Sequence, residues 1–295
     1  MTGERIVVVG DVINDIVAVP REPIRTDTDT TATIELTSGG SAANTAVWLA
    51  ECGAAVDLVA AVGAHDASAH EKELRAAGVT PWLQAEAGTP TGTIIVISQG
   101  AERSMLTERG ANSLLRPASV TDELLTGARL LHLSGYSIVD GFGADGTREL
   151  LDRAAAAGVP VTVNPGSVGF VTDFGVERFL GAVSGAAALF LSLDEARLLT
   201  GWPDADAAVR ALGARFPLVA LTRGADGVLV VSEGAEPVAV PAFPVPSVDP
   251  TGAGDAFIAG FLEAWLRTGD PVVAAGAAVR VASRAVTTIG GRPGR

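Results

Sequence analysis

A glycine- and proline-rich turn that leads directly into a helical pattern is the stretch of this chain best suited to chemistry. It comprises residues 248–257, with the sequence VDPTGAGDAF. Pro250 ends any preceding strand, and Gly252 and Gly254 allow the backbone to turn tightly. The first amides of a helix have no partner within that helix, so they form a ready site for an anion such as phosphate.

Asp255 is the unexpected member of this stretch, because a carboxylate beside a phosphate site repels the ligand unless it takes part in the reaction. It would then accept the proton of a substrate hydroxyl as that oxygen attacks a phosphoryl group. The alternative is an acidic residue that only stabilises the helix N-terminus, a common arrangement that contributes up to about 1 kcal/mol.

Composition restricts the ligands and partners of the protein. Its 295 residues are 48% hydrophobic, and 34 acidic against 21 basic residues give a net charge of −13. This charge disfavours nucleic acid and anionic membranes as partners, so local features must hold any anionic ligand. Cys52 is the only cysteine, which excludes an internal disulfide, and the N-terminal residues lack the apolar run of a signal peptide. We therefore expect a cytoplasmic protein without nucleic-acid or membrane partners.

Strand and helix patterns alternate through most of the chain. The strand-like runs lie at residues 5–10, 56–62, 130–133, 159–163, 189–192 and 218–221. This alternation predicts a mostly parallel sheet covered by helices on both faces, a Rossmann-like three-layer α/β/α fold within a single domain of residues 1–295. Two alanine-rich helices are expected at residues 253–268 and 271–286.

Four extended segments interrupt this alternation, at residues 16–19, 30–36, 91–98 and 105–107, with a turn at 100–103. We expect the regions 12–36 and 91–108 to leave the main sheet and pair into a small β-sheet lid, which would exclude water from a transfer reaction. The unpaired edges of such a sheet are a candidate contact for a homodimer.

Polar residues and glycines follow the first predicted strand and open the first predicted helix. Asp11 and Asp15 lie at the strand end, where ligands bind in open α/β sheets, although the same residues also suit a simple turn. Gly39 and Gly40 precede a helical pattern that carries Asn44 in its first turns. This glycine pair lacks the full spacing of a dinucleotide fingerprint.

Later strand ends carry similar groups. Asn164 follows one strand, and Glu195 stands in the first turn of the next helical pattern. Thr222, Gly224 and Gly227 belong to a glycine-rich turn between two strands. That turn either surrounds a nucleotide with its amides or is an ordinary loop.

Together these motifs resemble the ribokinase-like (PfkB-type) carbohydrate kinase family over almost the full length of the chain. DPTGAGDAF at residues 249–257 resembles the C-terminal signature of that family, and GGSAAN at 39–44 resembles its N-terminal signature. The resemblance implies a ribokinase-like fold with a small β lid and ATP-dependent phosphorylation of a hydroxymethyl group.

The resemblance also implies roles for single residues. Asp255 would be the catalytic base, and the anion hole for the γ-phosphate would be formed by Gly252, Ala253 and Gly254. The substrate hydroxyls would be held by Asp15, Gly39, Gly40 and Asn44. ATP would be held by Asn164, Thr222, Gly224 and Gly227.

The implied metal sites depart in part from the family pattern. Glu195 matches the acidic end of an N-x-x-E motif associated with Mg²⁺, but Ser192 occupies the Asn position, so we expect a contact through water. Thr162 replaces the acid of a D-x-N strand end. Asp249 and the carbonyl of Thr251 match positions that bind a monovalent cation such as K⁺ in several relatives.

The resulting prediction is a kinase that uses ATP and Mg²⁺ to phosphorylate the primary hydroxyl of a small ribose-, fructose- or keto-deoxy-sugar-acid-like acceptor. Arg109 either grips such an acceptor, including a sugar-acid carboxylate, or is a surface arginine paired with an acid such as Glu108. A nucleoside is the alternative acceptor: the lid has few aromatic residues, and Tyr136 is the only tyrosine, but Phe142 and Phe170 leave a stacked base possible.

The alternative of another class is a catalytically weak, nucleotide-binding regulatory protein. Ser192 and Thr162 favour this alternative, whereas the intact Asp255 and its glycines argue against it.

Overall fold

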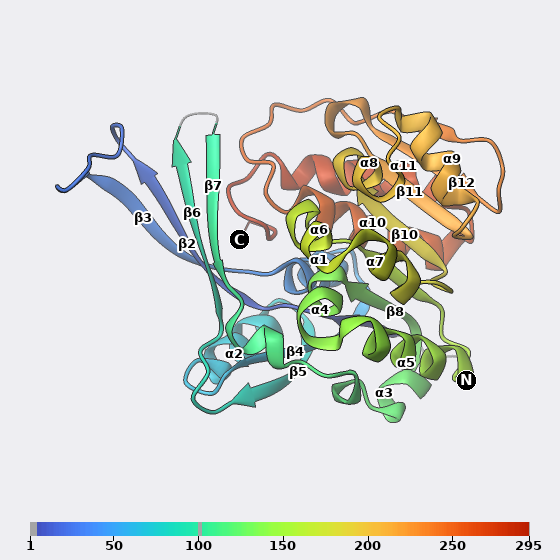
Figure 1. Cartoon of the computed structure of the whole chain (residues 1–295), viewed down its shortest axis with the longest axis horizontal. Coiled ribbons are helices and arrows are strands. Elements are labelled where there is room, and N and C mark those ends of the chain that lie inside the picture. The colour runs from blue at the N-terminus through green and yellow to red at the C-terminus, as the bar shows by residue number, and fades with distance from the viewer. Residues whose placement is uncertain (1–4, 100–101, 295) are drawn as a thin grey trace.

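Two sheets organise the computed structural model, which describes residues 5–99 and 102–294 (Figure 1). The larger sheet has nine strands in the order β13-β12-β11-β10-β9-β8-β1-β4-β5. Its strands are β1 (Arg5–Val9), β4 (Ala55–Gly63), β5 (Val79–Glu86), β8 (Ala128–Ser134), β9 (Val161–Asn164), β10 (Ala188–Ser192), β11 (Leu218–Thr222), β12 (Val228–Ser232) and β13 (Val238–Val240). The strands from β11 to β5 pair in parallel, whereas β12 and β13 extend the other edge in antiparallel pairs.

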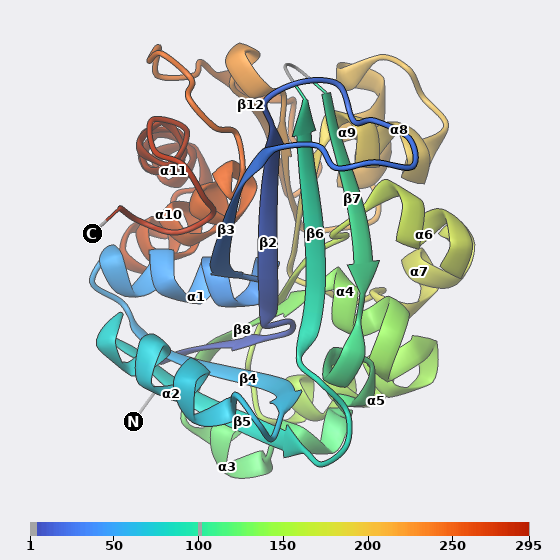
Figure 2. The same ribbon diagram turned by 90° about the vertical axis from the view of Figure 1, so that its left-hand side faces the viewer.

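Helices cover both faces of this sheet (Figure 2). One face packs against α1 (Ser41–Glu51), α2 (Ala67–Ala76), α10 (Ala253–Thr268) and α11 (Pro271–Ala285). The other packs against α3 (Asp122–Thr126), α5 (Gly143–Ala156), α6 (Val168–Phe174), α7 (Val176–Ala182), α8 (Leu193–Thr200) and α9 (Ala205–Gly213). Short helical turns complete the described part of the fold: α4 (Gly135–Ser137), η1 (Gly110–Leu114), η2 (Pro117–Ser119), η3 (Ile138–Phe142) and η4 (Gly224–Asp226).

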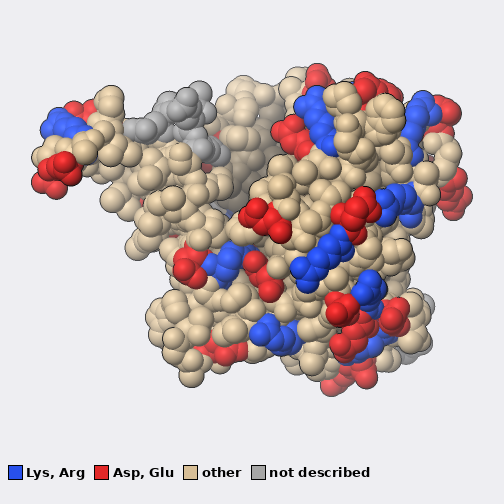
Figure 3. All heavy atoms as spheres, viewed as in Figure 1, with Lys and Arg blue, Asp and Glu red and all other residues tan. Residues whose placement is uncertain are grey.

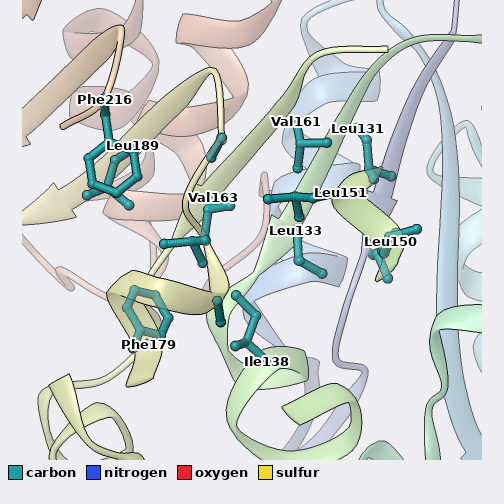
Figure 4. Packing of buried hydrophobic residues seen from close by; sticks show 14 of the residues in the cluster. Leu131, Leu133, Ile138, Leu150, Leu151, Val161, Val163, Phe179, Leu189 and Phe216 are labelled. Carbon is teal, nitrogen blue, oxygen red and sulfur yellow. The ribbon is translucent and has the colours of Figure 1, made fainter. Parts of the chain in front are cut away.

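The central strands are apolar because both of their faces are buried. In β1, Val7 and Val9 join the hydrophobic cluster on one face, whereas Ile6 and Val8 join the cluster on the other. Figure 4 shows part of the first cluster, in which side chains from β8, β9 and β10 meet those of the covering helices. Full burial of one such aliphatic side chain contributes about 1.5–3 kcal/mol, so these runs hold the sheet in place.

The smaller sheet has four strands in the order β3-β2-β6-β7. They are β2 (Ile13–Pro20), β3 (Ala32–Gly39), β6 (Gly92–Gln99) and β7 (Glu102–Glu108). Strands β2 and β6 are parallel, and the two outer pairs are antiparallel. This sheet projects from the main body, and the surface is hollowed between the two (Figures 1 and 3).

The predicted fold class is confirmed, with a large, mostly parallel sheet and a separate small one. The sequence patterns missed two strands, β5 and β13, and three helices, α6, α7 and α9. Strand β5 contains Pro81 and lies at a sheet edge, the position that tolerates a proline. Of the turn expected at 100–103, residues 100 and 101 lie outside the described residues. No helix within residues 5–99 and 102–294 is long and apolar enough to cross a membrane.

Candidate active site

A cavity of about 650 Å³ lies between the small sheet and the carboxyl edge of the large sheet. The ends of five neighbouring strands line it through Asp11, Tyr136, Asn164, Ser192 and Thr222. Parallel strands all end at the same edge, so residues far apart in the sequence meet there. The N-termini of α1 and α10 and the cavity-facing side of the small sheet complete the lining.

Asp255 lies in the first turn of α10 and lines this cavity. Its Oδ1 accepts a hydrogen bond from the Ser41 hydroxyl (2.7 Å), and its Oδ2 accepts one from the Asn44 amide (3.2 Å). Burial raises the pKa of Asp255 to about 7, and the nearby Asp11 and Glu195 act in the same direction, while the two hydrogen bonds oppose the rise. A carboxyl group with a pKa near neutrality is well suited to accept a proton from a substrate.

The glycines before Asp255 have different surroundings. Gly252 has φ +75°, and a Cβ there would lie 2.5 Å from the Cα of Gly291, so both the backbone conformation and the packing require glycine. Gly252 and Gly254 line the cavity. Ala253 is not among the described lining residues, and its N–H donates to the Pro250 carbonyl (3.2 Å).

The predicted acceptor side lies at the junction of β2, β3 and α1. Asp15 lines the cavity, and its pKa is raised to about 6 because burial outweighs the opposing charge of Arg292. Gly39 allows this carboxylate to approach β3, since a Cβ at Gly39 would lie 2.0 Å from Asp15 Oδ2. Gly40 lines the cavity with φ +97°, and a side chain there would meet the carbonyl of Asp11.

Asp11 has a structural role that the sequence did not reveal. It is buried, and its carboxylate accepts hydrogen bonds from the backbone amides of Ser41 (3.1 Å) and Ala42 (3.2 Å) at the start of α1. It therefore fixes the N-terminus of α1, and with it the positions of Ser41 and Asn44.

The residues expected to hold ATP fall into two groups. Thr222 and Asn164 line the cavity, and the buried Oδ1 of Asn164 has no hydrogen-bond partner in the described part of the chain. Gly224 is exposed with φ +58° and open space around it. Gly227 is buried, and a Cβ there would lie 2.1 Å from the Val240 carbonyl, so its packing against β13 already requires glycine.

Glu195 and Ser192 form a reciprocal cap at the start of α8. Glu195 Oε2 accepts hydrogen bonds from the backbone N–H (2.7 Å) and hydroxyl (2.9 Å) of Ser192, whose oxygen in turn accepts the Glu195 N–H (3.3 Å). Burial raises the pKa of Glu195. Thr162 is buried beside His132, with its hydroxyl 2.9 Å from Nδ1, so it is not at the cavity surface. The S-x-x-E pattern formed by Ser192 and Glu195 is typical of such a helix cap, so the sequence alone could have predicted it.

The cavity oxygens suit Mg²⁺. Glu195 supplies a carboxylate and Asn164 a side-chain amide oxygen, both of which are hard ligands of the type that Mg²⁺ prefers. No group of three or more His, Cys, Asp or Glu side chains that could hold a metal occurs among residues 5–99 and 102–294. Such a sparse donor set fits an ion bound mainly by substrate phosphates and water.

The candidate site for a monovalent cation lies beside the turn before α10. Asp249 accepts backbone hydrogen bonds from Thr251 (2.9 Å) and Gly290 (3.0 Å), and all three residues line the cavity.

Arg109 lies outside the cavity lining of the described chain, so the geometry favours the second of its two expected roles, pairing with an acid, over contact with the acceptor. Its guanidinium forms an ion pair with Asp140 and lies 4.7 Å from the ring centroid of Tyr136, with 11% of the side chain exposed. The Tyr136 ring contacts Phe170 edge to face at 5.8 Å and lines the cavity. Arg109 thus packs against Tyr136, which lines the cavity, and does not line the cavity itself.

Solved structures share this architecture. An adenosine kinase from Sinorhizobium meliloti superimposes with a TM-score of 0.88 at 27% identity, covering 99% of this chain and 96% of that one. A ribokinase from Giardia lamblia, at 21% identity and a TM-score of 0.80, shares the fold over 97% of this chain and 95% of its own. The fold and the cavity together define a kinase that transfers phosphate to a hydroxyl group.

Sequence comparison gives the family. Residues 4–294 match the model described as pfkB family carbohydrate kinase, and the chain belongs to this family. It is 30% identical to an ATP-dependent ribose-1-phosphate kinase from Halopiger xanaduensis, over 79% of this chain and 74% of the relative. It is 27% identical to a ribokinase from Bacillus subtilis, over 98% of this chain and 95% of the relative. Kinases of this family transfer phosphate to hydroxyl groups and use ATP as the phosphoryl donor.

Proposed function

We propose that this protein transfers the γ-phosphate of ATP to the primary hydroxyl of a small sugar, with Asp255 as the general base. The observation that carries the proposal is the Asp255 carboxylate, which has a pKa near 7 and lies in the cavity at the N-terminus of α10. It would accept the hydroxyl proton as the oxygen attacks phosphorus in line. The first amides of α10, around Gly252 and Gly254, would stabilise the charge on the transferred group.

The two substrates would approach Asp255 from different sides. Asp15, with Gly40 and Asn44, would hold the sugar hydroxyls, because a carboxylate accepts two hydrogen bonds from neighbouring hydroxyls at once. Thr222 and Asn164 at the strand ends would hold the phosphates of ATP.

Metal ions would be held by side chains already in the cavity. Glu195 and Asn164 would contact Mg²⁺, directly or through water, and the chemistry supplied there is neutralisation of phosphate charge. Asp249 and the Thr251 carbonyl would hold a monovalent cation such as K⁺.

The small sheet would act as a lid over the acceptor. Alternate residues of β2 and β6 face the cavity, and the apolar lining includes Val17, Val19, Ile94 and Val96 from these strands and Met105 from β7. An apolar cover would exclude water, whose attack on ATP competes with transfer to the sugar.

A nucleoside is the second candidate acceptor, and this apolar lid surface favours it. A nucleobase offers a flat apolar face to such a surface, whereas a free sugar offers hydroxyls on most sides. A sugar acid is a weaker candidate, because Arg109, which was expected to bind its carboxylate, pairs with Asp140 instead.

An ADP-release assay across acceptor classes tests the proposal. Pentoses, hexoses, keto-sugar acids and nucleosides are compared at equal concentration with ATP and Mg²⁺, with the Asp255→Asn variant as the blank. We expect turnover with one sugar or nucleoside class, and a rate about 10²–10⁴-fold lower in the Asp255→Asn variant. ATP binding without ADP release on any acceptor would contradict the proposal. The two cation sites are tested by repeating the assay without K⁺ and with Mg²⁺ chelated.

We also propose a homodimer through the small sheet. The face of this sheet that points away from the cavity exposes large apolar side chains, among them Ile34 (63% exposed), Leu36 (80%) and Leu106 (59%). Unpaired strand edges and exposed apolar surface both favour association. Sedimentation of the wild-type protein and of Leu36→Glu should show a dimer and a monomer respectively, and a monomeric wild-type protein would contradict this proposal.

A further inference from the structure

The C-terminal tail returns to the active site after α11 and packs on the junction of α1 and α10. The Trp48 indole N–H donates to the carbonyl of Gly291 (2.9 Å), which holds the tail against α1. On the α10 side, the backbones of Gly252 and Gly291 lie so close that a Cβ on Gly252 would be 2.5 Å from the Gly291 Cα. A Cβ on Gly291 would in turn lie 2.4 Å from the Asn44 amide nitrogen. The tail is therefore built into the wall beside Asp255.

Arg292 extends from this tail and contacts α1, α2 (Ala67–Ala76) and the end of β3. Its Nε donates to Asn44 Oδ1 (3.2 Å), its Nη1 pairs with Glu73 Oε1 (2.8 Å), and its Nη2 lies 3.3 Å from the Gly39 carbonyl. Only 14% of the side chain is exposed. The other oxygen of Glu73 accepts a hydrogen bond from the Ser38 hydroxyl (2.6 Å), so the carboxylate that anchors Arg292 is itself held in place.

These contacts determine which way the Asn44 amide faces. A guanidinium group only donates hydrogen bonds, so the group of Asn44 that faces it must be the carbonyl oxygen. The NH₂ group of Asn44 is thereby directed at Asp255 Oδ2, 3.2 Å away. The reversed amide would set N–H groups against the guanidinium and an oxygen against the carboxylate, which is unfavourable at both ends.

We infer that Arg292 is a positioning residue for the kinase reaction: it orients Asn44 so that its amide holds the Asp255 carboxylate, and it makes the C-terminal tail part of the catalytic apparatus. The inference rests on the proposed function, in which Asp255 is the base. The other titratable groups that act on Asp255 are Asp11 after β1 and Glu195 on α8, and both disfavour its charged form. The hydrogen bonds that favour the charged form therefore matter for a base that must be ionised to work.

The test compares the pH dependence of turnover in Arg292→Ala, Arg292→Lys and a control, Arg267→Ala, with the wild-type protein. Arg267 lies at the opposite end of α10 in an exposed pair with Glu263, so its loss should leave kcat and its pH dependence unchanged. For Arg292→Ala we expect kcat below pH 7 to fall about tenfold, as loss of a hydrogen bond to a charged group predicts, with recovery toward wild type near pH 9. KM for ATP should not change, and Arg292→Lys should lie between the two.

A purely structural role would give other results. An Arg292→Ala profile that is unchanged, or lowered equally at every pH, would overturn the inference. If Arg292→Ala does not fold, Glu73→Gln replaces it in the test, because this change weakens the ion pair that anchors Arg292. We then expect a smaller loss of kcat below pH 7, again with recovery near pH 9. A Glu73→Gln profile identical to that of wild type would count against the inference. Asp255→Asn is measured in parallel, because substantial turnover in that variant would refute the base itself, whereas an inactive Asp255→Asn with a normal Arg292→Ala profile would refute only the role of Arg292.

Discussion

The hydroxyl of Ser41 donates a 2.7 Å hydrogen bond to the carboxylate of Asp255, joining the first turn of α1 to the first turn of α10. The two helices carry the two glycine-rich motifs of the family, so this bond connects both motifs directly. It also favours the charged form of a carboxyl group whose burial favours the neutral form.

Replacing Ser41 with Ala should therefore shift the pH dependence of turnover. The bond lowers the pKa of Asp255, so its loss raises that pKa above the wild-type value of about 7. Because the base must be deprotonated, the acid limb of kcat/KM for the acceptor should move to higher pH, with a several-fold loss near pH 6.5 and little loss near pH 9. Ser41→Thr, which keeps a hydroxyl, is the matched control. Parallel profiles for Ser41→Ala and wild type would show that the bond does not tune the base.

The two glycines of the turn after β11 should have different roles, with Gly227 needed for packing and Gly224 for ATP binding. A Cβ on Gly227 would meet the Val240 carbonyl at 2.1 Å, and its φ is +81°. Gly227→Ala should thus lower Tm strongly while leaving KM for ATP near wild type. Gly224→Ala has open space at φ +58°, so it should cost only about 1–2 kcal/mol of backbone strain and act mainly on KM for ATP. Equal losses of stability in the two variants would contradict this division.

The pair formed by Arg109 and Asp140 should contribute to stability and to the shape of the acceptor site. Only 11% and 13% of these side chains are exposed, and removing one partner from a buried ion pair costs about 3–5 kcal/mol. Denaturation of Arg109→Ala, Asp140→Ala and the double variant should reveal coupling between the two positions. Because Arg109 packs on Tyr136, Arg109→Ala should also raise KM for the acceptor more than KM for ATP. Additive losses in the double variant would show that the pair is not coupled.

Local patterns were sufficient to predict the fold class and the candidate base. Apolar runs of 4–7 residues, ended by polar residues, predicted most strands of the large sheet, and parallel strands bring their ends to one edge. Asp255, Asp15 and Asn44 could be named because each lies within a few residues of a recognisable turn or helix start.

Contacts between distant segments could not be predicted in this way. Ser41 looked like an ordinary helix-start residue, and Arg292 like part of a polar tail, since neither sequence position reveals its partner. The partner of Arg109 could not be predicted for the same reason, because the packing of η3 against η1 brings Asp140 to it. Strand β5 was missed because Pro81 breaks its pattern, although an edge strand tolerates it.

The most direct test of the central claim is the turnover of Asp255→Asn with the preferred acceptor, measured together with its affinity for ATP. The asparagine keeps the size of the side chain but cannot accept the proton, so we predict a loss of about 10²–10⁴-fold in kcat with a Kd for ATP close to that of wild type. A variant that keeps more than about a tenth of the wild-type kcat would contradict the assignment of Asp255 as the catalytic base.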